Sequence, residues 1–191
     1  MSESEAGLRE RLVDVGVELV AAEGVQALTL REIARRAGVS HGAPRRYFPT
    51  HLELLSAIAR RGFVELADRA TRAADDNGGP RARLAALAHA YLRFAVERRG
   101  MYELMFRHDL LKSGHLGLRD HSLPLFGRLV ELVGRVRPDV DARLVGGALW
   151  ANLHGVGQLW GWGSLQLAVG TQDFDRMVDA VLVVYLGPDE T

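Results

Sequence analysis

Arg45, Arg46 and Tyr47 stand side by side in this chain, directly after a run of small or polar residues and a proline at 40–44. A guanidinium group presents a planar fork of N–H donors that matches a guanine edge or two phosphate oxygens, and a tyrosine hydroxyl can bind a phosphate. Small residues allow a backbone to approach a ligand closely. This composition is unsuited to a helix that packs into a core, and it predicts a segment that reads double-stranded DNA.

The residues before this segment predict the elements that position it. Thr29 and Glu32 have the spacing of a capping box, in which each side chain satisfies a backbone N–H at a helix start. Gly38 can adopt the left-handed backbone that ends such a helix, and Ser40 could cap a second helix immediately afterwards. Two short helices joined by a turn that contains glycine form a helix-turn-helix, which we expect over residues 29–48.

Pro44 lies inside the second expected helix. As the fourth helical residue it would remove the N–H that bonds to the Ser40 carbonyl, at the cost of no more than the first hydrogen bond of the helix. Its ring could touch a thymine methyl group, although a structural role is the more common one. We expect the neighbouring Phe48 to point into the core.

Positive charge is concentrated in the same region. The formal net charge of the whole chain is zero, so the chain as a whole is not a general binder of polyanions. Residues 31–61, by contrast, contain seven arginines and two glutamates, an excess of five positive charges. This clustering is the electrostatic footprint expected of DNA binding, although arginine is frequent throughout the chain and a solvated helix face is the alternative interpretation.

Residues 8–62 resemble the DNA-binding domain of the tetracycline-repressor (TetR) family of bacterial transcriptional regulators. The resemblance rests on the order and spacing of an amphipathic helix ending in Glu23-Gly24, then Thr29 with Ile33-Ala34, then Ala37-Gly38-Val39-Ser40, then Tyr47-Phe48-Pro49 and a fourth helix from about Thr50. It implies an all-α protein that binds a palindromic operator as a homodimer. It also implies that a small molecule bound in the C-terminal domain releases the operator.

The resemblance implies roles for single residues as well. Four positions would contact phosphates: Thr29, Ser40, Tyr47 and His51. Five would face bases: His41, Gly42, Pro44, Arg45 and Arg46. Family members commonly carry a bulky apolar residue and an aromatic residue where this chain has Pro44 and Arg45, and a lysine where it has His51, so the resemblance does not imply the operator sequence.

The remainder of the chain has helical periodicity and no alternation typical of a sheet. The turn-forming run at residues 75–80 is the clearest break. Beyond it we expect helices at about 81–98, 101–112, 122–136, 140–160 and 173–186. We therefore divide the chain into a DNA-binding domain, residues 1–62, and a C-terminal regulatory, ligand-binding and dimerisation domain, residues 63–191.

Residues 144–172 carry no formal charge over 29 positions. Their length would allow a bilayer span, but polar residues such as Asn152 and repeated glycines make a poor transmembrane helix, so we expect no membrane role. A helix that is apolar on most sides must be covered, and a second subunit would supply the cover. We expect a homodimer through the last two helices, with the final helix contributing Val178, Val181, Leu182 and Tyr185. The run 150–155 also resembles the tryptophan and histidine-glycine signature of one C-terminal class of the family, called WHG.

A small apolar or amphipathic effector would occupy an apolar pocket in the C-terminal domain. The candidate lining residues are Met101, Met105, Phe106, Phe126, Trp150 and His154, with Tyr91, Phe94 and Tyr102 as further possibilities. Unbranched and flat side chains can line a cavity without filling it, which favours Met101, Met105 and Trp150. Methionines and aromatics at helical spacing are nevertheless more often core residues.

Several other classes of protein have little support. The absence of cysteine excludes disulfides, cysteine nucleophiles and thiolate metal sites. The spacing of His108, Asp109, His115 and His121 matches no standard metal site, so we expect neither a metal nor a cofactor. No signal-like run occupies the first twenty residues, and a cytoplasmic protein is the default expectation.

The leading hypothesis is a ligand-responsive repressor without catalytic activity. Two alternatives remain. One is a helical enzyme in which His108, Asp109 and His154 act around a C-terminal cavity, and the other is a dimerisation module that binds another protein.

Overall fold

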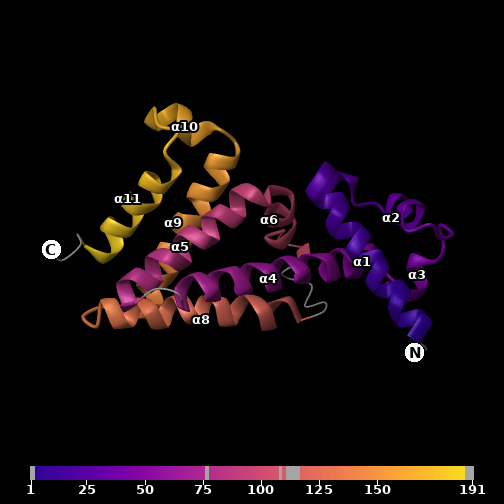
Figure 1. The fold of residues 1–191 in the computed structure, drawn as a ribbon, viewed down its shortest axis with the longest axis horizontal. Coiled ribbons are helices and arrows are strands. Elements are labelled where there is room, and N and C mark those ends of the chain that lie inside the picture. Colours follow the sequence, from indigo (N-terminus) through magenta and orange to yellow (C-terminus); the bar gives the residue numbers. More distant parts are fainter. Residues whose placement is uncertain (1–2, 76–77, 108, 111–116, 188–191) are drawn as a thin grey trace. The chain divides into compact units, whose positions relative to one another are not determined.

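The computed structural model describes residues 3–75, 78–107, 109–110 and 117–187, and within them it contains helices and no strand. The expectation of an all-α protein is therefore confirmed. In chain order the elements are α1 (Glu3–Glu23), the 3₁₀ turn η1 (Val25–Ala27), α2 (Leu30–Arg36), α3 (Pro44–Tyr47), α4 (His51–Asp75), α5 (Pro80–Glu97), α6 (Arg99–Met105), α8 (Leu118–Val136), α9 (Ala142–Gly161), α10 (Ser164–Val169) and α11 (Phe174–Leu186) (Figure 1).

Most helix ends lie within a few residues of their predicted positions, but three predictions need correction. The helix expected at 101–112 ends at Met105 in α6, and residues 108 and 111–116 lie outside the described residues. The expected gap between residues 161 and 170 contains the short helix α10. The second helix of the DNA-reading motif is much shorter than expected and is described below.

The chain folds into two compact units. The first unit contains residues up to 65 together with 98–121, and the second contains 66–97 together with residues from 122 onward. The first of these boundaries, at residue 65, lies close to the expected division at residue 62, and α6 groups with the first unit although it follows that division in the chain.

The core of the first unit depends on glycines that let its helices approach closely. A Cβ atom on Gly16 of α1 would lie 2.3 Å from Ile58 Cδ1 of α4, and one on Gly100 of α6 would lie 2.4 Å from the Val20 carbonyl oxygen of α1. Gly62 of α4 contacts α6 in the same way, since its Cβ would lie 2.5 to 2.7 Å from sulfur and carbon atoms of two methionines, Met101 and Met105. The result is a unit in which α6 packs directly on α1 and α4.

The second unit is built on α5, α9 and α11, which lie side by side (Figure 1). Val178, Val181 and Leu182 of α11 are buried within this unit, between 0% and 7% exposed. Tyr185 donates a hydrogen bond from its hydroxyl to the Ala148 carbonyl at 3.3 Å. Packing inside the chain thus already buries the three aliphatic side chains, whereas Tyr185 is half-buried, and the expected homodimer through the last two helices stays a prediction. None of the described helices is both long enough and apolar enough to cross a membrane.

Candidate nucleic-acid interface

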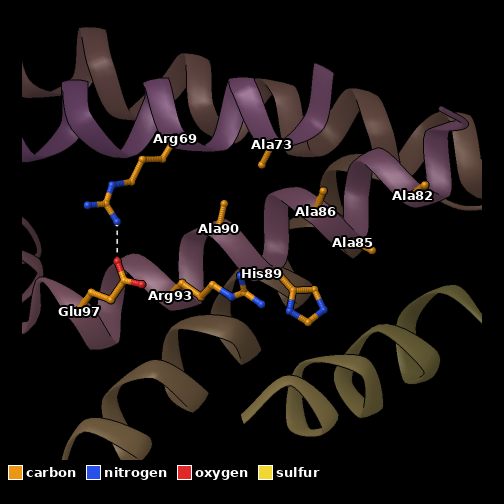
Figure 2. A pocket seen from close by; sticks show the side chains of 9 residues that line it. All are labelled: Arg69, Ala73, Ala82, Ala85, Ala86, His89, Ala90, Arg93 and Glu97. Atoms are coloured by element: carbon orange, nitrogen blue, oxygen red, sulfur yellow. Dashed lines mark hydrogen bonds and ion pairs between the residues drawn. The ribbon is translucent and has the colours of Figure 1, made fainter. Parts of the chain in front are cut away.

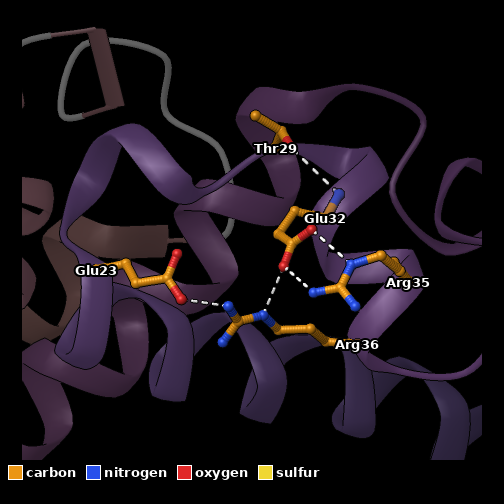
Figure 3. A network of polar contacts seen from close by, with 5 residues as sticks. All are labelled: Glu23, Thr29, Glu32, Arg35 and Arg36. Carbon is orange, nitrogen blue, oxygen red and sulfur yellow. Dashed lines mark hydrogen bonds and ion pairs between the residues drawn. The ribbon is translucent and has the colours of Figure 1, made fainter.

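Helix α2 begins at Leu30, and Thr29 caps it. The Thr29 backbone is extended, and its Oγ1 accepts a hydrogen bond from the Glu32 N–H at 3.1 Å (Figure 3). The reciprocal half of the expected capping box is absent, because the Thr29 N–H donates to the Ala27 carbonyl at 2.7 Å. The Glu32 carboxylate is instead directed to Arg35 and Arg36.

The Glu32 carboxylate joins α2 to the end of α1. It accepts hydrogen bonds from Arg35 Nε at 2.9 Å and Nη2 at 2.6 Å, and from Arg36 Nε at 2.7 Å. Arg36 also bonds to Glu23, the last residue of α1 (Figure 3). Hydrogen bonds from Arg35, and next from Arg36, lower the pKa of Glu32 from 4.5 to about 2, so the carboxylate is ionised at neutral pH. Two arginines of α2 are thus engaged inside the unit.

The turn after α2 has the predicted form. Gly38 adopts a left-handed backbone with φ of +67°, and its N–H donates to the Arg35 carbonyl at 3.2 Å. The Val39 N–H donates to the Ala34 carbonyl at 3.0 Å, which completes a Schellman motif. The end of α2 is therefore fixed by local hydrogen bonds.

Helix α3 contains only Pro44–Tyr47. The Ser40 side chain makes no hydrogen bond to cap it, and the Ser40 carbonyl accepts from the Ala43 N–H at 2.9 Å in a tight turn. Because Pro44 has no N–H to bond to Ser40, regular α-helix starts at Pro44, a first position where proline costs no hydrogen bond. The Phe48 N–H closes the helix on the Pro44 carbonyl at 2.9 Å.

Four of the five residues expected to face bases are exposed: His41, Gly42, Arg45 and Arg46. Pro44 is buried at the first position of α3, where its ring has a structural role, and its expected base contact stays a prediction. Phe48 is 1% exposed, as expected, and the Arg9 guanidinium lies 4.9 Å from its ring centroid.

The four expected phosphate contacts differ in their surroundings. Thr29 and Ser40 are exposed, and Tyr47 is half-buried. His51 is also exposed, but its Nε2 lies 2.6 Å from the Leu28 carbonyl. A carbonyl only accepts, so Nε2 donates this hydrogen bond. His51 therefore holds the start of α4 against the residue that precedes Thr29.

Much of the positive charge counted along residues 31–61 is neutralised inside the first unit. Arg35 and Arg36 are paired with glutamates, and Arg61 pairs with Glu10 and Asp14 of α1. Within the described residues, three arginines of this segment make no ion pair and no side-chain hydrogen bond: Arg31, Arg45 and Arg46. Arg31 is exposed at the start of α2, and we add it to the candidate DNA contacts. In the sequence it looks like Arg35 and Arg36, and the structure distinguishes it from them because they form ion pairs and it does not.

Thr29→Ala is expected to lower the free energy of unfolding by about 1 kcal/mol, because it leaves the Glu32 N–H without its acceptor. Urea denaturation followed by circular dichroism measures the change. Thr29→Ser is the matched control, since it keeps the hydroxyl and should stay close to the parent. Equal losses in both variants would show that the cap is not what Thr29 contributes.

The six expected effector contacts are divided between the two units. Met101 and Met105 are 2% and 0% exposed against Gly62, and Phe106 contacts the rings of Phe63 and Tyr102 at centroid distances of 5.7 and 4.9 Å. The two methionines belong to the core of the first unit, and the half-buried Phe106 lies at its edge. The other three, Phe126, Trp150 and His154, belong to the second unit.

Trp150 and His154 meet at the Tyr91 hydroxyl. Trp150 Nε1 donates to this hydroxyl at 3.2 Å, and the hydroxyl lies 3.0 Å from His154 Nδ1. The Phe126 ring lies 6.1 Å from the Trp150 ring. Burial lowers the pKa of His154 and so favours the neutral ring, whose tautomer decides whether Nδ1 accepts from the tyrosine hydroxyl or donates to it.

The enzyme alternative gains no support from the geometry. His108 lies outside the described residues, Asp109 pairs with Arg107 at 2.5 Å, and His154 belongs to a different unit from Asp109. No group of three or more histidine, aspartate or glutamate side chains placed to hold a metal occurs in the part of the chain that the structure describes.

Two family models match the chain. Residues 12–58 match the model described as "Bacterial regulatory proteins, tetR family", and residues 84–184 match "Tetracyclin repressor-like, C-terminal domain". Together these models cover both the DNA-reading motif and most of the second unit.

Curated relatives match over shorter stretches. The HTH-type transcriptional regulator BetI of Rhizobium meliloti is 36% identical over 85 residues, which are 44% of this chain and 42% of that protein. The HTH-type transcriptional repressor KstR of Mycolicibacterium smegmatis is 34% identical over 83 residues, 44% of this chain and 41% of that protein. The chain thus matches about two fifths of the length of these relatives.

Similarity to solved structures extends over nearly the whole chain. A protein with unknown function from Rhodococcus sp. RHA1 superimposes with a TM-score of 0.80 at 29% identity, covering 94% of this chain and 93% of that one. The two-unit helical fold therefore occurs as a whole in another protein.

Proposed function

Because the chain belongs to the tetracycline-repressor (TetR) family of regulators, we propose that it is a ligand-responsive transcriptional regulator, most simply a repressor. It binds a palindromic double-stranded DNA operator as a homodimer, and a small apolar or amphipathic effector releases it. The protein acts without catalysis, in the cytoplasm where the chromosome lies. One observation carries the DNA-binding part of this proposal, namely the exposed and unpaired state of Arg45 and Arg46 on α3.

Helix α3 is the reading element. Arg45 and Arg46 offer donor forks to base edges, and the exposed His41 and Gly42 let the backbone approach the groove. Thr29, Ser40, Tyr47 and Arg31 contact the flanking phosphates. These phosphate contacts fix the register of α3 on the duplex but carry no sequence information.

The second subunit covers apolar side chains on the outer faces of α9, α10 and α11. Several large side chains there are exposed to solvent: Leu144 at 72%, Trp162 at 61%, Leu167 at 87%, Val169 at 52%, Val183 at 50% and Val184 at 77%. Apolar surface of this extent on a helical protein marks an interaction site. A two-fold dimer would bury it and present two copies of α3 to the two halves of a palindrome.

Release requires that the effector bind two states of the dimer with different affinity. The chain passes between the two units within α4, at the junction between α5 and α6, and within α8, and these segments can carry the effect of an effector from the second unit to the first. Since α6 packs on α1 through Gly100, a shift at this junction would reach the helix that supports the DNA-reading motif.

Selection of bound fragments from a random pool of double-stranded DNA tests the proposal. The purified protein should enrich an inverted repeat whose half-sites are centred about one helical turn or a multiple of it apart. It should also sediment as a dimer. If a folded dimer enriches no sequence from the pool, the DNA-binding proposal is overturned and a module that binds another protein is favoured.

A further inference from the structure

In the second unit, alanines of α4 and α5 line a groove of about 570 Å³ (Figure 2). Arg69 Nη1 in this lining donates to Glu97 Oε2 at 2.8 Å, and Arg93 contacts Asp175 of α11 at 3.2 Å. Among the described residues that line the groove, these pairs leave no charge to select a ligand. The first unit holds a different arrangement, in which a cation lies on an aromatic ring at the end of α3.

Helix α3 consists of a single turn, so contacts with the rest of the first unit must hold it in place. The Phe48 N–H closes this turn on the Pro44 carbonyl at 2.9 Å. One turn of helix is unstable alone, because nucleation fixes several residues for one hydrogen bond. Both ends of α3 are instead anchored in the protein. Pro44 at its first position is buried, and Phe48 directly after its last position is 1% exposed.

The two arginines proposed to read DNA lie between these anchors. Arg45 and Arg46 occupy the middle positions of α3, and both are exposed. Phe48 follows Arg46 by two residues, so a displacement of its ring would move the backbone that carries both guanidinium groups. The side chain that packs on Phe48 therefore affects how α3 meets a duplex.

Arg9 of α1 covers the Phe48 ring. Helices α1 and α3 pack against each other, and the Arg9 guanidinium carbon lies 4.9 Å from the ring centroid. A guanidinium within about 6 Å of a ring centroid is attracted by the negative face of the ring. The Arg9 side chain is 29% exposed, so this attraction acts where much of the water has been excluded.

A carboxylate competes only weakly for Arg9. The ion pair of Arg9 with Glu10 is long, at 3.8 Å, and the Glu10 side chain is 54% exposed. Glu10 also bonds to Arg61 of α4. A long ion pair at an exposed position contributes little, so the ring, and not the carboxylate, sets the position of the Arg9 side chain.

We propose that Arg9 is a positioning residue for DNA reading. Its guanidinium holds Phe48, and through Phe48 the C-terminal end of α3, so that Arg45 and Arg46 keep a fixed direction. A fixed reading helix loses less conformational entropy on binding than a loose one. This inference rests on the proposed function, because it concerns how α3 is presented to an operator.

Hydrogen exchange of the full-length protein without DNA, followed by NMR, tests the contact itself. The amides of Arg46 and Phe48 bond to carbonyls at the start of the α3 turn. In Arg9→Gln these two amides should exchange about two- to fivefold faster, the factor to which one such attraction corresponds. The amide of Ile33 in α2 should keep its rate.

Two further variants serve as controls. Arg9→Lys keeps a cation for the ring and should restore exchange to within about twofold of the parent. Arg11→Gln removes an exposed arginine two residues along α1, on another face of the helix, and should behave as the parent does. Unchanged exchange at Phe48 in Arg9→Gln would overturn the proposal. Equal acceleration at Ile33 and Phe48 would overturn it too, since Arg9 would then stabilise the whole unit.

Fluorescence anisotropy with the selected operator and with an unrelated duplex tests the role in DNA reading. Arg9→Gln should lower the ratio of the two affinities by about two- to fivefold without changing the salt slope, and Arg9→Lys should restore it. An unchanged ratio would overturn the positioning role. Equal losses on both duplexes, with a salt slope reduced by about one, would overturn it in favour of a phosphate contact by Arg9.

The two measurements separate this inference from the proposed function. If the parent binds no operator, the proposed function fails, and the exchange rates still decide whether Arg9 holds α3. If the parent binds its operator but Arg9→Gln exchanges and binds as the parent does, the proposed function stands and the inference about Arg9 fails.

Discussion

Arg45→Ala and Arg46→Ala are each expected to weaken operator binding by about 1 to 3 kcal/mol if the arginine contacts a base. Both side chains are exposed on α3, and no ion pair holds either of them within the described residues. DNA therefore gains two guanidinium groups without breaking contacts inside the protein. Fluorescence anisotropy with the selected operator and with single-base variants of it measures the loss.

The pattern of loss distinguishes two kinds of contact. An arginine on a base should relax the sequence preference at one operator position, whereas an arginine on a phosphate should weaken all sequences alike and reduce the salt slope by about one. Arg99→Ala is the matched control, since it removes an exposed arginine of α6 that pairs with Glu103 at 3.0 Å within its own helix. Unchanged affinity and unchanged preference in both α3 variants would mean that another element reads the DNA.

Gly100→Ala is expected to lower the free energy of unfolding by about 1 to 3 kcal/mol, although glycine-to-alanine changes in helices usually stabilise. The new Cβ would lie 2.4 Å from the Val20 carbonyl oxygen, so one helix must move. The atom that it meets belongs to the backbone of α1 and cannot turn aside as a long side chain could. The overpacking cost therefore exceeds the gain of about 0.5 to 1 kcal/mol from helix propensity.

Gly127→Ala is expected to change the free energy of unfolding in the opposite direction. Gly127 lies inside α8, and a Cβ there would meet nothing within 4 Å. This variant should therefore gain about 0.5 to 1 kcal/mol in urea denaturation followed by circular dichroism. Equal behaviour of the two alanine variants would show that α6 does not pack on α1 as closely as these contacts require.

Helix ends were the part of the fold most accessible to sequence reasoning. Thr29 and Gly38 fix the two ends of α2 through hydrogen bonds to residues no more than a few positions away. The error at α3 also has a local cause, because proline favours the first position of a helix, and Pro44 could have been taken as that start. The prediction instead began the helix at the residue after Ser40.

The pairing of the charged side chains was less accessible to sequence reasoning. Arg36 and Arg61 are neutralised by Glu23, Glu10 and Asp14, acids that lie outside the segment whose charge was counted.

The sequence by itself determined the helix-turn-helix, its family and the pair of arginines that α3 presents. These features depend on residue types and on hydrogen bonds within one or two helical turns, which a linear pattern records directly. The tertiary structure decided which arginines remain unpaired, that Met101 and Met105 pack against Gly62 in a core, and that an alanine-lined groove exists. Each of these depends on atoms brought together from separate helices, because ion pairing and packing act through space and leave no fixed spacing in the chain.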